Sequence, residues 1–354
     1  MRHFDYDKSL SALLRPEILS LCSAIHEYKG KQDFYLGAKP DTLDALLEIA
    51  KIQSTDASNR IEGIYTSNAR LKALVAEKTT PRNRNEREIL GYRDVLSTIH
   101  DAHDAIPVTP SVILQLHRDL FKHLPSGIGG VWKNGDNVIA QTDANGVSSV
   151  RFRPVPAFET PSSMEALCGE LRKVRDERIH DPLLAAALFT LDFLCIHPFS
   201  DGNGRMSRLL TLLLLYHAGY VVGKYISLDA LVERSKETYY ETLGESSSGW
   251  HEGENDPVPF VGYFLQIVLR GYREFESRIE KVVANPATKG TRIRAIFDDT
   301  LGSVRKKDIL LRCPDISEAM VEKALKTLLD AGLIRKIGAG PATAYVKTDA
   351  YGKR

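Results

Sequence analysis

The stretch "IHPFSDGNGRMSRLL", residues 196–210, decides how this sequence folds. Pro198 cannot continue a helix and restricts the residue before it, so one helix is expected to end near His197. The glycines that follow permit a tight turn, and a second helix is expected to begin directly after it. Gly202 and Gly204 leave the amides of that helix N-terminus accessible, which favours the binding of an anion.

Charged side chains surround this expected anion site. Arg205 and Arg208 lie three residues apart on the first turn, and both can fork onto phosphate oxygens. Asp201 precedes the turn and is placed to hold a hard cation such as Mg²⁺. His197 titrates near neutral pH and is suited to take a proton from an attacking hydroxyl. These residues predict phosphoryl or nucleotidyl transfer, where catalysis is mainly positioning and charge neutralisation.

Composition excludes several broad classes of protein. The 354 residues carry a formal net charge of +1, so no global field favours nucleic acid or a membrane. The longest apolar run, residues 183–196, is too short to span a bilayer, and the N-terminus lacks the apolar core of a signal peptide. The 4 cysteines show no paired spacing. We expect a reduced, cytoplasmic protein of two or three domains.

The apolar periodicity predicts a mainly α-helical protein. Thr109 and Pro110 are typical of a helix start, and the polar residues 244–257 are expected to form a loop. Glycine and Asn-Gly pairs around residues 137–140 and 150–155 predict a β-hairpin inside the helical domain. Helices are expected over residues 41–63, 85–103, 109–124, 162–179, 181–197, 204–220 and 258–283.

A small C-terminal domain is expected over residues 291–350, after the linker "ANPATKG" at 284–290. Three short helical patterns precede two short strands about a Gly-Pro turn, which is the order of a winged helix. From Pro286 onward, 14 Lys and Arg stand against 8 Asp and Glu, a charge of +6 that is compatible with DNA contact. The third helix, however, carries Glu318, Glu322 and Asp330 against only Lys323 and Lys326, so a protein-interaction or dimerisation role stays open beside DNA binding.

The central stretch resembles the signature of the Fic family, His-x-Phe-x-Asp/Glu-Gly-Asn-Gly-Arg-x-x-Arg. The resemblance implies a helical Fic core, expected over residues 101–283, and transfer of AMP from ATP to a hydroxyl side chain of a target protein. In the Doc branch, which acts as a kinase, Lys replaces the second motif glycine, so Gly204 favours AMP transfer. Every fixed position of the signature is filled, by His197, Phe199, Asp201, Gly202, Asn203, Gly204, Arg205 and Arg208.

The resemblance also implies a role for each of these residues. His197 would be the general base, Asp201 would bind Mg²⁺, and Phe199 would anchor the loop in the core. The remaining residues would hold the phosphates of ATP: Asn203 with the Gly202 and Gly204 amides the α- and β-phosphates, Arg205 the β- and γ-phosphates, and Arg208 the γ-phosphate.

A second motif, "SNRIEG" at residues 58–63, lies in the N-terminal helical region expected over residues 1–100. Ser58 and Glu62 are four residues apart and share a helix face. With Gly63 they resemble the inhibitory motif of Fic proteins, Ser/Thr-x-x-x-Glu-Gly/Asn. The resemblance implies that Glu62 pairs with Arg208 and keeps it from the γ-phosphate, as a switch that forms and breaks.

The predicted hairpin, within "GGVWKNGDNVIAQTDANG" at residues 129–146, sits where the family has its flap. That flap pins the target segment by strand-like pairing. The family usually has Arg where Lys133 stands in this sequence.

Two alternatives to an autoinhibited protein adenylyltransferase stay open. One is a Fic-fold transferase that uses another nucleotide or phosphate donor. The other is a winged-helix DNA-binding regulator whose Fic domain senses nucleotide. The expected ligands are ATP as substrate and Mg²⁺ as cofactor. The expected partner is a target protein with a Tyr, Thr or Ser hydroxyl, while self-modification and a homodimer stay open and no membrane is expected.

Overall fold

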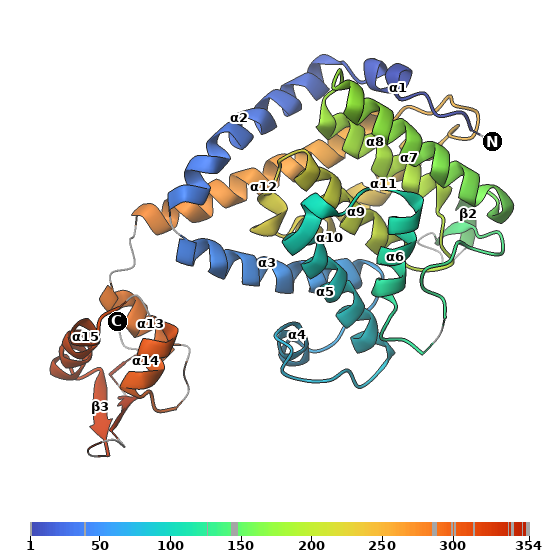
Figure 1. Ribbon diagram of the computed structural model, residues 1–354. Helices are drawn as coiled ribbons and strands as arrows, with labels where there is room; N and C mark the ends of the chain where they lie inside the picture. The colour runs from blue at the N-terminus through green and yellow to red at the C-terminus, as the bar shows by residue number, and fades with distance from the viewer. Residues whose placement is uncertain are drawn as a thin grey trace. The chain divides into compact units, whose positions relative to one another are not determined.

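The computed structural model describes residues 2–38, 40–125, 127–142, 148–284, 289–298, 300, 302–313, 316–338, 340, 343–348 and 350–351. The chain divides into two compact units, Met1–Ser277 and Arg278–Arg354 (Figure 1). Within the described ranges, no helix is both long enough and apolar enough to cross a membrane.

The first unit is mainly helical, as predicted. Three short 3-10 helices and a two-stranded sheet join its α-helices: η1 (His103–Ala105), η2 (Ala157–Glu159), η3 (Val222–Lys224), β1 (Ile139–Thr142) and β2 (Ser148–Phe152). The α-helices are α1 (Tyr6–Ala12), α2 (Pro16–Ala38), α3 (Pro40–Ile61), α4 (Asn68–Val75), α5 (Arg84–Ala102), α6 (Pro110–Leu120), α7 (Thr160–Glu177), α8 (Pro182–Ile196), α9 (Asn203–His217), α10 (Leu228–Arg234), α11 (Lys236–Ser247) and α12 (Val258–Ala284).

Helix α8 forms the centre of this unit. Every residue after Pro182 is buried, because the helix is apolar on all sides and is covered by its neighbours α7, α9, α11 and α1. The side chain of Asp181 caps its first turn by accepting a hydrogen bond from the Leu183 amide. The helix ends at Ile196, as Pro198 predicts, and His197 then adopts a left-handed backbone with φ of 51°. The helix end therefore sets the position of the predicted catalytic residue.

Helix α3 brings residues 58–62 to this centre by packing against α5 and α10. Gly63 has a φ of 77°, in the left-handed region that glycine tolerates, and this backbone conformation terminates α3. Helices α2 and α12 lie side by side (Figure 1), where the Tyr272 hydroxyl donates to the Gln32 side chain.

The predicted hairpin is present. Strands β1 and β2 pair antiparallel, with Ala140 opposite Val150, and the register shifts next to Ile139. Residues 143–147, within the predicted flap, lie outside the described residues. The predicted loop at 244–257 is wrong at its start, because α11 continues to Ser247. Ser246 is fully buried there and accepts a hydrogen bond from the Phe260 amide, so tertiary contacts extend the helix.

The second unit has its own hydrophobic core. Its elements follow the predicted order of three helices and a hairpin, and Val304 adds a short bridge to Tyr345 between the first two helices. Predicted linker residues 285–288, and residues 339, 341 and 342 of the predicted turn, lie outside the described residues. The winged-helix assignment and the predicted domain limits stay predictions. The elements are α13 (Lys289–Asp298), α14 (Lys306–Arg312), α15 (Glu318–Asp330), β3 (Ile334–Ile337) and β4 (Ala344–Lys347).

Candidate active site

The turn between α8 and α9 is closed by Asn203. Its side-chain oxygen accepts the Phe199 amide at 2.9 Å, and its Nδ2 donates to the Phe199 carbonyl at 2.7 Å. Gly202 has a φ of 82°, which lets the chain enter α9 at once. Because both ends of the Asn203 side chain bind the turn, it is the backbone amide of this residue that remains to face a phosphate.

His117 of α6 packs against the turn between α8 and α9 and hydrogen-bonds to it. Its ring stacks on the fully buried Phe199, with centroids 3.6 Å apart. Its Nδ1 accepts the Gly130 amide, so its Nε2 donates to the Asp201 carbonyl at 3.0 Å. Burial lowers the pKa of His117 to about 4, and the ring stays neutral in this role. The sequence analysis did not identify this residue.

The first residues of the flap are fastened to the same turn. The backbone amide of Lys133 donates to the Pro198 carbonyl at 2.9 Å, and its Nζ donates to the Ile196 carbonyl at 3.1 Å. Lys133 Nζ also binds the side chain of Asn137, whose Nδ2 donates to the Phe199 carbonyl. Lys133 is only 3% exposed, and this burial lowers its pKa to about 8. Lys133 therefore connects the flap to the backbone on both sides of His197.

His197 presents its ring to a large pocket. Its Nδ1 lies 3.3 Å from the Leu194 carbonyl, and donation to that carbonyl leaves Nε2 as a proton acceptor. Burial lowers the pKa of His197 to about 4, and the cations of Lys133 and Arg151 act in the same direction. The ring is therefore neutral at physiological pH and able to accept a proton.

The pocket has a volume of about 810 Å³, within the range of small-molecule sites. Residues from the flap and residues from α11 both contribute to its walls. His197, Gly204 and Arg208 line it together with Glu62. The flap contributes Val138, Ile139, Ala140 and Arg151, and α11 contributes Tyr239, Tyr240, Glu241, Leu243, Gly244 and Glu245.

The two arginines of the motif have different surroundings. The Arg205 guanidinium is 1% exposed and lies 2.8 Å from Glu88 of α5. It also packs 5.1 Å from the centre of the Phe121 ring. Its Nε and Nη1 have no hydrogen-bond partner among the described residues. Two nitrogen donors of the Arg205 guanidinium are thus available to a ligand, although the ion pair with Glu88 already fixes its position.

Arg208 is held by the second motif. Its Nε donates to the Ser58 hydroxyl at 2.7 Å, and its Nη2 donates to the Ser58 carbonyl at 2.8 Å. The same Nη2 lies 2.9 Å from Glu62 Oε1. Burial disfavours the charged guanidinium, but Glu62, Tyr239 and Asp229 keep the pKa of Arg208 above its ordinary value. The structure therefore brings Ser58 and Glu62 to Arg208, which lies about 150 residues further along the sequence.

Glu62 also lies against the N-terminus of α9. A Cβ atom built on Gly204 would lie 2.2 Å from Glu62 Oε1, so only glycine leaves room for the carboxylate. The N-terminus of a helix attracts negative charge through its unpaired amides and its dipole. The Glu62 carboxylate therefore lies beside the helix start at which the sequence analysis predicts a phosphate. Gly63 follows it in the turn that ends α3.

Asp201 lies directly before Gly202, which caps the start of α9. Its side chain is 46% exposed, with Arg84 at 3.6 Å and Arg205 at 3.7 Å. Within the described part of the chain, no group of three His, Cys, Asp or Glu side chains is placed to hold a metal ion. Mg²⁺ is commonly held by one or two carboxylates together with substrate phosphates. A half-exposed carboxylate beside a phosphate site fits that arrangement.

Residues 107–215 match the family model of the Fic/DOC family. The chain is 31% identical over 240 residues to a protein adenylyltransferase Fic of Culex quinquefasciatus, covering 64% of this chain and 43% of that protein. It is 25% identical over 220 residues to a protein adenylyltransferase Fic of Nematostella vectensis, covering 60% and 46%. The chain thus spans less than half the length of these curated relatives.

Two solved structures show the same fold. A Fic family protein from Desulfovibrio desulfuricans covers 95% of this chain with a TM-score of 0.63 and 21% identity; 97% of that protein is matched. A Fic domain containing signaling protein from Bacteroides thetaiotaomicron covers 73% of this chain, with a TM-score of 0.62, 24% identity and 97% of its own length matched. The fold is a mainly helical Fic fold with small antiparallel sheets, including a C-terminal hairpin. Residues 107–215 of this chain therefore match the Fic/DOC family, and over a longer span the chain is similar to proteins named protein adenylyltransferase Fic.

Proposed function

We propose that this chain is an autoinhibited protein adenylyltransferase that moves AMP from ATP to a hydroxyl side chain of a target protein. One observation carries the proposal: a neutral His197, the N-terminus of α9 at Gly204, and Arg208 all face the same pocket. This arrangement supplies a base, an anion site and a cation in a space large enough for a nucleotide. The relatives named protein adenylyltransferase support the same reaction.

In this proposal the phosphates of ATP bind at the start of α9. The backbone amides of Asn203 and Gly204 would bind the α- and β-phosphates, and the Gly202 amide would join them after leaving the Asp201 carboxylate, to which it donates at 2.6 Å in this structure. The unpartnered donors of Arg205 contact the β- and γ-phosphates, and Arg208 contacts the γ-phosphate. Asp201 holds Mg²⁺, which supplies charge neutralisation on the phosphates.

The reaction then needs one proton acceptor. Nε2 of His197 takes the proton of the target hydroxyl, and the hydroxyl oxygen forms a bond to the α-phosphorus. The bond from the α-phosphorus to its bridging oxygen breaks, and pyrophosphate leaves. Because Lys133 and His117 fix the loop, His197 stays in place for this step. The flap hairpin is proposed to pair with the target segment.

Autoinhibition follows from the position of Glu62. Its carboxylate binds Arg208 and lies at Gly204, so it competes with phosphate for both the cation and the helix N-terminus. Ser58 holds Arg208 in the orientation that Glu62 meets. ATP in this state is proposed to bind in an unproductive pose, and movement of α3 would release the restraint.

Labelled nucleotide tests the reaction type. The full chain carrying Glu62→Gly, with Mg²⁺ and ATP labelled at either the α- or the γ-phosphate, is incubated alone and with a cell lysate. Label from the α position alone is expected on protein. Label from γ alone would make the chain a kinase, and no label from either would favour another donor. The matched His197→Ala variant should lose the label while still binding ATP.

We also propose that residues 291–350 form a winged helix, and one observation favours DNA as a second ligand. Two of the three acidic residues of α15 that weigh against DNA, Glu318 and Glu322, pair with Lys306 of α14, while the third, Asp330, is exposed at the end of the helix. Lys323 and Lys326 of α15 are exposed and would be available to contact the DNA backbone. Salt-dependent binding of the full chain to duplex DNA, weakened by Lys323→Ala, is expected; binding that this variant leaves unchanged would favour a protein-interaction role.

A further inference from the structure

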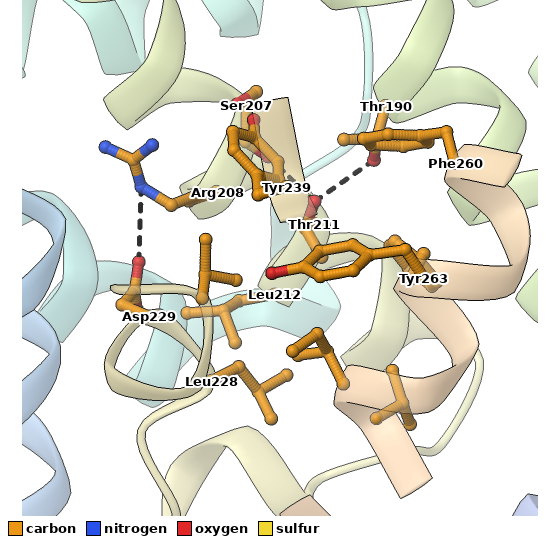
Figure 2. Close-up of a pocket in the computed structure, with 14 residues that line it drawn as sticks. Thr190, Ser207, Arg208, Thr211, Leu212, Leu228, Asp229, Tyr239, Phe260 and Tyr263 are labelled. Atoms are coloured by element: carbon orange, nitrogen blue, oxygen red, sulfur yellow. Dashed lines mark hydrogen bonds and ion pairs between the residues drawn. The ribbon is translucent and has the colours of Figure 1, made fainter. Parts of the chain in front are cut away.

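Arg208 has a second carboxylate partner, Asp229, in the first turn of α10. Asp229 Oδ1 lies 3.5 Å from Arg208 Nε, and Figure 2 marks this ion pair with a dashed line. The hydroxyl of Tyr92 donates to the same oxygen at 3.0 Å. The Ser58 hydroxyl accepts from Arg208 Nε and also hydrogen-bonds to the Asp229 carboxyl. Asp229 is therefore fixed by groups from three different helices.

The two carboxylates differ in how easily they can leave. The side chain of Asp229 is 2% exposed, whereas that of Glu62 is 31% exposed at the end of α3. Arg208 and Asp229 both line a small cavity of about 50 Å³ whose walls are mostly apolar, among them Leu212 (Figure 2). On this side few neighbouring groups can therefore hydrogen-bond to a charge that loses its partner.

Charge neutralisation gives Asp229 a function. Arg208 is 8% exposed, and a buried cation that loses its only carboxylate is strongly destabilised. If Glu62 were the sole carboxylate partner, its departure would leave the buried Arg208 cation without a counter-ion. With Asp229 present, the guanidinium keeps a counter-ion and its orientation when Glu62 moves away. Burial raises the pKa of Asp229 and the Arg208 cation opposes this rise, so each group supports the charge of the other.

We propose that Asp229 is a positioning residue that keeps Arg208 neutralised and in place when Glu62 leaves, and thereby makes the Glu62 contact reversible. The regulatory part rests on the proposed function. The electrostatic part, in which two carboxylates share one arginine, does not.

A double-mutant cycle on the full chain tests the electrostatic part without nucleotide. The variants are Glu62→Gln, Asp229→Asn and the combination, since both substitutions remove charge at nearly constant volume. Thermal unfolding is followed by tryptophan fluorescence, because both tryptophans, Trp132 and Trp250, lie in the first unit. Each single variant should fold, because one carboxylate remains. The double variant should lose about 3 °C or more in unfolding midpoint beyond the sum of the two single losses.

A third substitution shows that the loss arises at Arg208. Adding Arg208→Met to the double variant removes the uncompensated cation and should raise the midpoint again. The control combines Glu62→Gln with Asp94→Asn, because Asp94 pairs with Arg93, Lys122 and His123 and not with Arg208. The losses in unfolding midpoint of these two variants should be additive. Additive losses for Glu62 and Asp229, an unfolded Asp229→Asn single variant, or no rescue by Arg208→Met would each overturn the proposal.

A second readout concerns regulation. With Glu62 intact, Asp229→Asn should reduce the basal incorporation of α-phosphate label several-fold, because Glu62 becomes the only carboxylate of Arg208 and is released less often. Increased incorporation in this variant would contradict the regulatory part. If no variant of the chain transfers label, the proposed function fails, whereas the unfolding cycle still decides the electrostatic part.

Discussion

The carboxylate of Glu62 lies between the guanidinium of Arg208 and the first turn of α9. Its Oε1 is 2.9 Å from Arg208 Nη2, and the same oxygen would lie 2.2 Å from a Cβ atom built on Gly204. One side chain thus occupies two groups that favour phosphate, an arginine and a helix N-terminus. The contact joins two segments that lie far apart in the chain, the end of α3 and the start of α9.

The pH dependence of transfer should report the low pKa of His197. The neutral ring is the base, and its pKa of about 4 means that protonation begins only well below neutral pH. In the Glu62→Gly chain, kcat/KM for ATP should stay level from about pH 8 to about pH 5.5 and fall below that range. A loss centred near pH 6.5, the ordinary value for histidine, would contradict this prediction.

Replacement of Lys133 by Met should disturb His197 directly. The variant loses the bond to the Ile196 carbonyl and a cation that lowers the pKa of His197, so that pKa should rise. NMR titration of the histidine rings measures it, with the signal assigned through His197→Asn. Lys133→Arg, which keeps the charge, should retain the low value, as should Lys122→Met on the surface. An unchanged His197 pKa in Lys133→Met would show that Lys133 has no influence on the base.

Glu88 should be needed for the stability of the first unit. Glu88→Gln leaves the Arg205 guanidinium, 1% exposed, without its closest carboxylate, which should cost roughly 3–5 kcal/mol of unfolding free energy. The matched control is Arg84→Gln, because Arg84 pairs with the same Glu88 from the surface and should cost at most about 1 kcal/mol. Urea unfolding followed by tryptophan fluorescence compares them. Equal losses would mean that the buried pair contributes no more than the surface pair.

The turn and its flanking helices were predictable because their signals are local. Pro198 ends α8, the glycines permit the turn, and Thr109 caps α6 by accepting the Val112 amide. The Glu62–Arg208 pairing was predictable only through a motif, because periodicity says nothing about which helices meet. Its geometry in the structure agrees with that expectation, while the inhibitory role remains a proposal.

Other parts of the site carry no local signal. His117 and Glu88 lie in segments whose patterns indicate only ordinary helices, and Asp229 lies in a segment for which no element was predicted. Each of the three contacts a residue distant in the sequence. Asn203 shows a related limit: its type suggests phosphate contact, but its side chain closes the turn. Helix α11 was not among the predicted helices, and its last residues were predicted as a loop because the stretch is polar, whereas a tertiary hydrogen bond at Ser246 holds them in the helix.

The most direct test of the central claim is the initial rate of α-phosphate label transfer from ATP by the Glu62→Gly chain, compared with the unchanged chain and with Glu48→Gln. Glu48 lies on the exposed face of the same helix, where it is 66% exposed. We predict a rate at least about tenfold higher for Glu62→Gly, equivalent to about 1.4 kcal/mol of released restraint, and no change for Glu48→Gln. Equal rates of α-label transfer in all three proteins would contradict the proposed restraint of Arg208 by Glu62.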